Sequence, residues 1–121
     1  MSTVCCAAFP PPEPSSHPVD VGRRSEAAVV EALLRRGYSV SVPQSSNERY
    51  DLIVDVGRLL RVQVKTGRLR NGAVTFSTRS VRVNSRGAHW RDYHGEIDYF
   101  FVYCPDTDGV YAVPIEDAAR G

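Results

Sequence analysis

The chain has 121 residues, of which 42% are apolar and 24% are charged, and its formal net charge is +1. This length suits a single domain with one hydrophobic core, and the composition is that of an ordinary globular protein. Because no apolar stretch approaches the roughly 18 residues that a membrane-spanning helix needs, these quantities exclude a membrane protein.

The first eighteen residues differ in composition from the rest of the chain. They contain five prolines and four serines or threonines, and no arginine or lysine that could begin a signal peptide. We therefore expect residues 1–18 to form a disordered, proline-rich lead-in and residues 19–121 to form the folded domain. The three cysteines lack the spacing of a zinc site and cannot all pair within one chain. A reducing compartment, the cytoplasm, is therefore expected.

The apolar pattern next predicts one long helix. It is expected over about residues 23–36, with Asp20 as its N-cap and Gly37 as the left-handed residue beyond its end. Its apolar stripe consists of Val29, Val30, Leu33 and Leu34. Glu26 lies at the edge of that stripe, so its carboxylate is expected near the core. An ion pair with Arg23 or Arg61 is the alternative there.

Alternating residues then predict strands joined by turns. The expected strands are residues 38–42, 50–56, 59–66, 73–78, 97–104 and 110–113, with a short helix after Pro114. Asn71 and Gly72 supply one of the turn signals. Residues 79–95 show no sustained period and are expected to be loop-like or weakly helical. The predicted fold class is α/β, with a mixed central sheet and the long N-terminal helix packed on it.

Lys65 is the only lysine, against fourteen arginines, and it stands near the end of a predicted strand. Lysine is a compact point charge that can sit beside a water or a single phosphate oxygen, whereas arginine is a planar fork. Residues two apart on a strand share a face, so Gln63 and Lys65 point away from the core and Val62 and Val64 point into it. Antiparallel pairing with the preceding strand brings Asp51 to the same end.

Oxygen atoms at this end of the predicted sheet suit a hard divalent cation. Mg²⁺ takes one or two carboxylates together with waters and substrate phosphate oxygens. Asp51, Gln63, the backbone carbonyl of Val64 and Glu26 from the helix could supply such oxygens. Phosphodiester hydrolysis needs an ion that polarises the phosphate and a second cation that orients water or offsets developing charge. Mg²⁺ or Mn²⁺ is therefore the expected cofactor, and Lys65 fits the second role.

A stretch without acidic residues follows from Lys65. Residues 65–91 contain seven basic residues and no aspartate or glutamate, and polar residues and Trp90 are interspersed among them. Such groups bind phosphates or stack on bases. The stretch predicts DNA binding through six arginines, with a simply solvated face as the alternative: Arg68, Arg70, Arg79, Arg82, Arg86 and Arg91.

These features together resemble the PD-(D/E)XK nuclease superfamily. Asp51 is followed twelve residues later by Gln63-Val64-Lys65, and Glu26 stands on a preceding helix. Residues 48–55, 61–66, 98–103 and 110–114 are similar to the branch typified by group I intron homing endonucleases, in which glutamine replaces the second acid. The similarity covers about residues 21–117.

The resemblance implies a restriction-endonuclease-like core in which Asp51 binds the metal, Gln63 occupies the second ligand position, Lys65 is the catalytic lysine and Glu26 is the helix carboxylate. Two positions depart from the superfamily pattern. Tyr50 stands in place of proline, and the neutral Gln63 removes one negative charge from the metal site. Metal affinity should then fall unless Glu26 or a DNA phosphate compensates. The superfamily also has a helix between later strands, where this chain has residues 79–95.

The expected activity is a metal-dependent DNA endonuclease of the homing or restriction type, acting on double-stranded or branched DNA. Ser45 and Ser46 before Asp51 are also compatible with an archaeal-type Holliday junction resolvase. A catalytically silent DNA-binding module of the same fold is the other class. Because a double-strand cut by one active site per chain generally requires two protomers, a homodimer or homotetramer is expected, associated with the nucleoid when bound to DNA.

Overall fold

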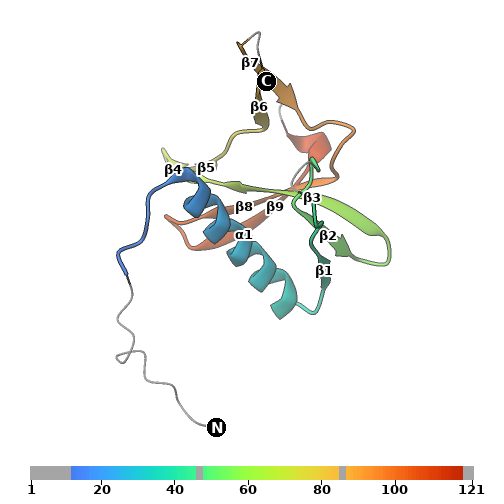
Figure 1. Cartoon of the computed structure of the whole chain (residues 1–121). Helices are drawn as coiled ribbons and strands as arrows, with labels where there is room; N and C mark the ends of the chain where they lie inside the picture. Colours follow the sequence, from blue (N-terminus) through green and yellow to red (C-terminus); the bar gives the residue numbers. More distant parts are fainter. Residues whose placement is uncertain (1–11, 46–47, 85–86, 119–121) are drawn as a thin grey trace.

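One long helix lies on a face of a five-stranded sheet, and two smaller hairpins branch from that sheet (Figure 1). The computed structural model describes residues 12–45, 48–84 and 87–118, with the backbone alone for the strands between residues 79 and 92. Within these residues, no helix is long and apolar enough to cross a membrane. The predicted α/β architecture, a mixed sheet with the N-terminal helix packed on it, is confirmed.

The helix α1 spans Pro18–Arg35 and so begins earlier than expected. Proline is favoured in a first turn because its missing N–H would have had no partner there. The expected N-cap at Asp20 is wrong, because His17 caps the helix and its Nδ1 accepts the N–H of Val19 at 3.2 Å. Asp20 lies in the first turn, where its negative charge complements the helix dipole.

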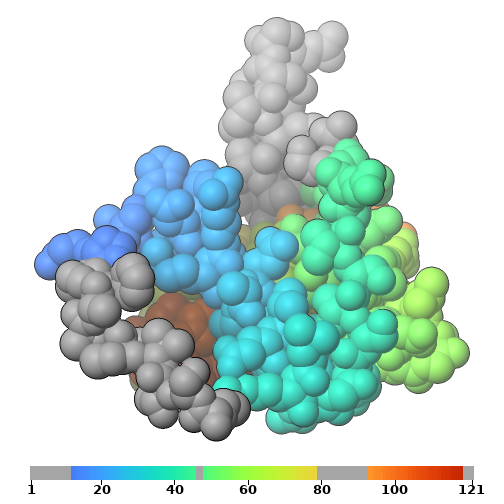
Figure 2. Space-filling model, turned by 60° about the horizontal axis from the view of Figure 1, so that its bottom comes forward, coloured from blue at the N-terminus to red at the C-terminus, as the bar shows by residue number. Residues whose placement is uncertain are grey.

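The C-terminal end of α1 follows the sequence prediction. Gly37 adopts the left-handed conformation with φ +87°. Its N–H donates to the carbonyl of Leu34 at 3.0 Å, and that of Tyr38 donates to the carbonyl of Leu33 at 3.1 Å. These two bonds form a Schellman motif, which satisfies carbonyls that the helix leaves without partners. The chain then turns back along the helix, and in Figure 2 the segment after α1 lies beside it.

The central sheet has the strand order β1-β2-β3-β8-β9. Its strands are β1 Ser39–Ser41, β2 Leu52–Asp55, β3 Leu59–Thr66, β8 Tyr99–Cys104 and β9 Gly109–Pro114. β3 and β8 are parallel and the other neighbours are antiparallel, so the sheet is mixed. The short C-terminal helix expected after Pro114 is a single 3-10 turn, Ile115–Asp117.

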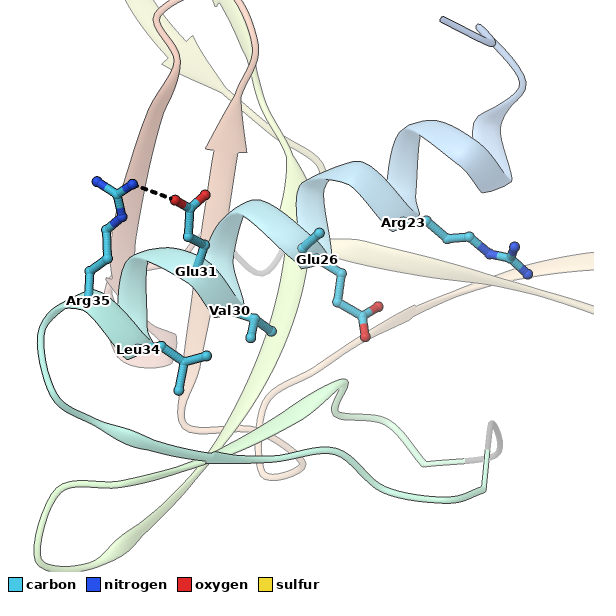
Figure 3. Close-up of a pocket in the computed structure, with 7 residues that line it drawn as sticks. Arg23, Glu26, Val30, Glu31, Leu34 and Arg35 are labelled. Atoms are coloured by element: carbon cyan, nitrogen blue, oxygen red, sulfur yellow. Dashed lines mark ion pairs between the residues drawn. The ribbon is translucent and has the colours of Figure 1, made fainter. Parts of the chain in front are cut away.

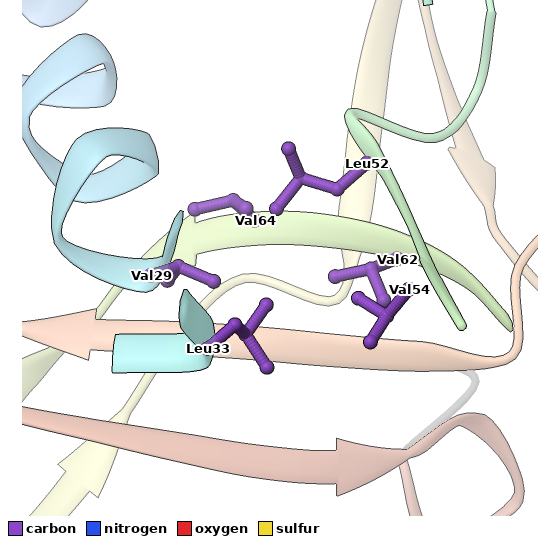
Figure 4. Packing of buried hydrophobic residues seen from close by; sticks show 6 residues of the cluster. All are labelled: Val29, Leu33, Leu52, Val54, Val62 and Val64. Carbon is purple, nitrogen blue, oxygen red and sulfur yellow. The ribbon is translucent and has the colours of Figure 1, made fainter. Parts of the chain in front are cut away.

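Two clusters of buried side chains cover the two faces of this sheet. Val29 and Leu33 of α1 pack on Leu52, Val54, Val62 and Val64 (Figure 4). The other cluster contains Tyr93, Ile97, Phe100 and Val102. Fully burying apolar side chains of this size stabilises a fold by about 1.5–3 kcal/mol each. The predicted alternation in β3 is confirmed, because its valines face the helix and leave the positions between them on the opposite face.

The connection from β3 to β8 consists of two hairpins. β4 Arg68–Arg70 and β5 Ala73–Thr75 pair around Asn71 and Gly72, whose φ angles of +50° and +79° fit the predicted turn. β6 Arg79–Asn84 and β7 Gly87–Asp92 form the second, so the expected loop or weak helix is wrong there. A two-stranded ribbon is held by backbone hydrogen bonds and needs no period of polarity in its sequence.

Candidate active site

Asp51 lies just before β2, where the pairing of β2 with β3 ends. Its N–H donates to the carbonyl of Val62 at 2.8 Å, and its Oδ2 accepts the N–H of Val64 at 3.0 Å. These two bonds place Asp51 beside Gln63, as the expected strand register requires. Within the described part of the chain, Oδ1 accepts no hydrogen bond. The carboxylate is therefore oriented by the backbone and keeps one oxygen for a ligand.

Lys65 lies on the face of β3 opposite the helix. Its Nζ is 3.5 Å from the hydroxyl oxygen of Tyr93 and 4.9 Å from the centroid of that ring. Burial lowers the pKa of Lys65; the charge of Asp51 opposes this shift, and the charge of Arg49 adds to it. The ammonium group is thus held in a partly desolvated position within the electrostatic reach of Asp51.

The pKa values of both candidate carboxyl groups are raised, chiefly by burial. Burial raises the pKa of Asp51 above its ordinary value of 3.8, although the N–H of Val64 and the charge of Lys65 oppose the shift. Burial also raises the pKa of Glu26 above 4.5, and the charge of Asp51 adds to that effect. A cation between two such carboxylates would favour their ionised forms. Asp51 is therefore the residue that couples Glu26 on one side to Lys65 on the other.

Glu26 reaches this region from the helix. In Figure 3 its carboxylate projects from α1 toward the segment between β1 and β2, and no ion pair joins it to the guanidinium of Arg23. The other expected partner, Arg61, binds Asp98 through its N–H at 2.8 Å and its Nε at 3.3 Å. No ion pair among the described residues involves Glu26. The alternative that an arginine neutralises this carboxylate is therefore wrong for the residues that the structure describes.

A hollow of about 250 Å³ lies beside Glu26 and Asp51. It is lined by Glu26, Val42, Pro43, Gln44, Ser45, Glu48, Tyr50 and Asp51. A water takes about 30 Å³ of liquid volume, so a hydrated ion has room there. In residues 12–45, 48–84 and 87–118, no group of three or more His, Cys, Asp or Glu side chains could alone hold a metal ion. Two carboxylates with waters nevertheless fit the oxygen donors that Mg²⁺ accepts.

Three of the four candidate catalytic residues are linked in the structure, because Glu26 and Asp51 line one hollow and the charges of Asp51 and Lys65 interact. Gln63 shares the face of Lys65, but among the described residues no hydrogen bond joins it to the other three. The N–H of Val64 is engaged by Asp51. Glu48, which was not among the candidates, lines the same hollow as Glu26 and Asp51.

The arginines proposed for DNA binding fall into two groups. Arg68 and Arg70 lie on β4 and are exposed. Arg79, Arg82 and Arg91 belong to β6 and β7, whose backbone alone is described, and Arg86 lies outside the described residues. Ser46, part of the resolvase alternative, also lies outside them.

Three residues beside Lys65 were missed by the sequence analysis. Tyr93 contacts Lys65, Arg49 lies 3.9 Å above the Tyr93 ring, and Glu96 binds Arg49 at 2.6 Å. Arg49 stands two residues before Asp51, which was a usable signal. Tyr93 and Glu96 come from the segment before β8, and no spacing in the sequence links them to Lys65.

Ser25 connects the helix to β3 beside the candidate residues. It is 1% exposed, and its hydroxyl shares a hydrogen bond of 2.5 Å with that of Thr66. Both partners are neighbours of candidate residues in the chain: Ser25 directly precedes Glu26, and Thr66 directly follows Lys65. This bond therefore fixes the helix against the strand at the site.

We predict that Ser25→Ala lowers the free energy of unfolding by about 1–3 kcal/mol, because it leaves a partly buried hydroxyl of Thr66 without its partner. Denaturant unfolding would measure the change. The double variant Ser25→Ala/Thr66→Val removes both polar groups and should recover most of the loss. A double variant no more stable than Ser25→Ala would contradict this account of the bond.

Comparison with known proteins identifies the family of the chain. The family model described as PD-(D/E)XK endonuclease matches residues 16–120, so the chain belongs to that family. A search of solved structures found a bacterial homing endonuclease, I-Ssp6803I, which is 26% identical, with a TM-score of 0.70. The match covers 84% of this chain and 71% of the other. Among curated proteins no match was found.

Proposed function

We propose that this protein is a divalent-metal-dependent DNA endonuclease, of the homing or restriction type, that hydrolyses phosphodiester bonds. The observation that carries the proposal is the electrostatic coupling of Glu26, Asp51 and Lys65 at one end of β3, in a chain of the endonuclease family. The matched structure is that of a homing endonuclease, which supports the same class. Mg²⁺ or Mn²⁺ suits the oxygen donors present.

Each residue has a distinct part in the proposed reaction. Asp51, through the oxygen that the backbone leaves available, and Glu26 would hold the ion. A bound divalent ion polarises the phosphodiester and lowers the pKa of water, which supplies the nucleophile. Lys65 places a positive charge on the adjoining face, where it would orient water or offset the charge that develops on phosphate. Gln63 would supply a neutral oxygen.

In this proposal, DNA binds to the exposed basic residues that follow Lys65. Arg68 and Arg70 extend from the strand that immediately follows β3, so a DNA backbone bound there would pass close to Lys65. We include Arg79, Arg82, Arg86 and Arg91 in this proposed surface from their sequence positions. A homodimer or homotetramer that acts on DNA in the cytoplasm, associated with the nucleoid, completes the proposal.

A nicking assay tests this function. The purified protein is incubated with supercoiled plasmid and with a four-way DNA junction, each with Mg²⁺, with Mn²⁺ and with a chelator. Metal-dependent nicking of the plasmid is expected. Cleavage confined to the junction would favour the resolvase alternative. DNA binding without metal-dependent cleavage of either substrate would support the silent binding module and overturn the proposed activity.

The neutral Gln63 yields a separate prediction about metal affinity. Gln63→Glu adds a negative charge near Asp51, so it is expected to keep or strengthen the binding of Mn²⁺. Calorimetric titration of the protein alone measures this without any DNA. Gln63→Ala is the matched control that removes the oxygen, and it should bind no more tightly than the parent. Complete loss of Mn²⁺ binding by Gln63→Glu would remove this position from the ligand set.

A further inference from the structure

Tyr93 is a fixed aromatic residue at the edge of the candidate site. It is 4% exposed, and its ring meets Phe100 edge-on, with centroids 5.4 Å apart and an interplanar angle of 87°. Its carbonyl accepts the N–H groups of Glu96 at 3.0 Å and Ile97 at 3.3 Å. The ring of Tyr93 is therefore held by the second buried cluster and its backbone by these hydrogen bonds, independently of any ligand.

Two cations lie against this ring. The guanidinium carbon of Arg49 is 3.9 Å from the ring centroid, and the ammonium of Lys65 is 4.9 Å from it. Both distances fall within the roughly 6 Å range of a cation–π interaction. Lys65 is nearer to the hydroxyl oxygen, at 3.5 Å, than to the centroid. Tyr93 thus contacts Lys65 through the polar end of the ring.

Arg49, in the segment that precedes Asp51, helps to fix the position of Tyr93. Its Nε donates to Glu96 at 2.6 Å, and both side chains are largely shielded from solvent. Because Arg49 precedes Asp51 by two residues, this ion pair joins the segment that carries Asp51 to the turn that carries Tyr93. The position of Tyr93 is thereby linked to the position of the carboxylate as well as to that of the lysine.

We propose that Tyr93 is a positioning residue that holds the ammonium of Lys65 at the site, with Arg49 and Glu96 fixing Tyr93 relative to Asp51. A lysine has four flexible carbons and loses considerable rotational freedom when its ammonium is fixed. Contact with the buried Tyr93 restricts the positions that the Lys65 ammonium can take before substrate binds. The catalytic consequence rests on the function proposed above, whereas the positioning itself does not.

The single lysine allows a direct measurement of this positioning. Protein labelled with ¹³C at the lysine ε-carbon gives one lysine signal, since Lys65 is the only lysine. The ring of Tyr93 should shift its ε-protons from the positions of free lysine and make the two inequivalent. In Tyr93→Leu these effects should disappear. In Tyr93→Phe, which keeps the ring, the shift should persist while the signal shows greater motional averaging.

Tyr99→Leu is the matched control, because Tyr99 packs on the helix side of the sheet. It should leave the lysine signal unchanged. Parent protein whose ε-protons resemble those of free lysine, or a signal unchanged in both Tyr93 variants, would overturn the proposal. Should Tyr93→Leu fail to fold, the averaging in Tyr93→Phe decides.

A cleavage measurement distinguishes the loss of lysine positioning from a general loss of stability or DNA binding. With saturating DNA in single turnover, Tyr93→Phe should slow cleavage about 10- to 100-fold, as a small misplacement of a catalytic group does. Its DNA affinity and melting temperature should stay close to those of the parent. A loss of affinity with an unchanged rate would overturn a role through Lys65. If the parent cleaves nothing, the proposed function fails, and the lysine signal alone still decides the positioning.

Discussion

Lys65→Ala is expected to reduce metal-dependent cleavage by about 100-fold or more, the usual effect of removing one preorganised electrostatic group. The ammonium is partly buried and lies within the electrostatic reach of Asp51. DNA affinity should remain nearly intact, because binding depends on many phosphate contacts. Single-turnover nicking rates and fluorescence anisotropy on the same DNA measure the two quantities.

Two further variants make this result specific. Lys65→Arg keeps the charge but replaces the compact ammonium by a planar fork, so it should restore little of the rate. Arg68→Ala removes an exposed charge of β4 and should have the opposite profile, with weaker binding and a shallower dependence of affinity on salt. If Lys65→Ala lost mainly affinity and Arg68→Ala lost mainly rate, the two roles assigned here would be reversed.

Asp51→Asn is expected to abolish cleavage and to stabilise the protein in metal-free buffer at neutral pH. The amide oxygen can still accept the N–H of Val64, whereas the buried negative charge is gone. Since the site is partly exposed, solvent screening limits the gain to about 1 kcal/mol or less. Asp51→Ala is the matched control, and it should be destabilised because the Val64 N–H then lacks its acceptor. Denaturant unfolding with a chelator present measures both.

The pH dependence of this difference has a definite sign. Burial raises the pKa of Asp51 above 3.8 in the folded protein, so the folded state binds the proton more tightly than the unfolded state. The favourable contribution of this carboxyl group to the free energy of unfolding is fully present below pH 3.8. It is lost as the pH rises through the pKa that the group has in the folded protein. The advantage of Asp51→Asn should therefore be present at neutral pH and vanish in acid. An Asn variant less stable than the parent at pH 7 would contradict the raised pKa.

Much of the fold follows from local patterns in the sequence. The alternation in β3 and the turn at Asn71 and Gly72 specify strands and a hairpin directly, because period and turn chemistry are local properties. The apolar pattern predicts the start of α1 too late, because the stripe begins only after the first turns, and Pro18 at the start of the helix lies outside that pattern. The β6–β7 hairpin was missed because the pairing of two strands leaves no required polarity pattern.

The candidate site was only partly predictable. Asp51 lies just before β2 and Lys65 lies on β3, so their proximity follows from the register of the hairpin that these two strands form. The location of Glu26 depends on where the helix crosses the sheet. Its place at the edge of the apolar stripe indicated that its carboxylate lies near the core. Tyr93 enters the site through the packing of a distant segment on Phe100. Such contacts depend on the tertiary fold and leave no signal in residue spacing.

The separation of the hairpins from the central sheet bears on how new target preferences could be engineered. All four candidate catalytic residues precede Gly67, whereas β6 and β7 pair only with each other in the ladder. Exchanging that ribbon for another of equal length breaks no strand pairing of the five-stranded core. Chimeras that swap it would therefore test whether the arginines proposed there select the DNA target, with the five-stranded sheet left unchanged.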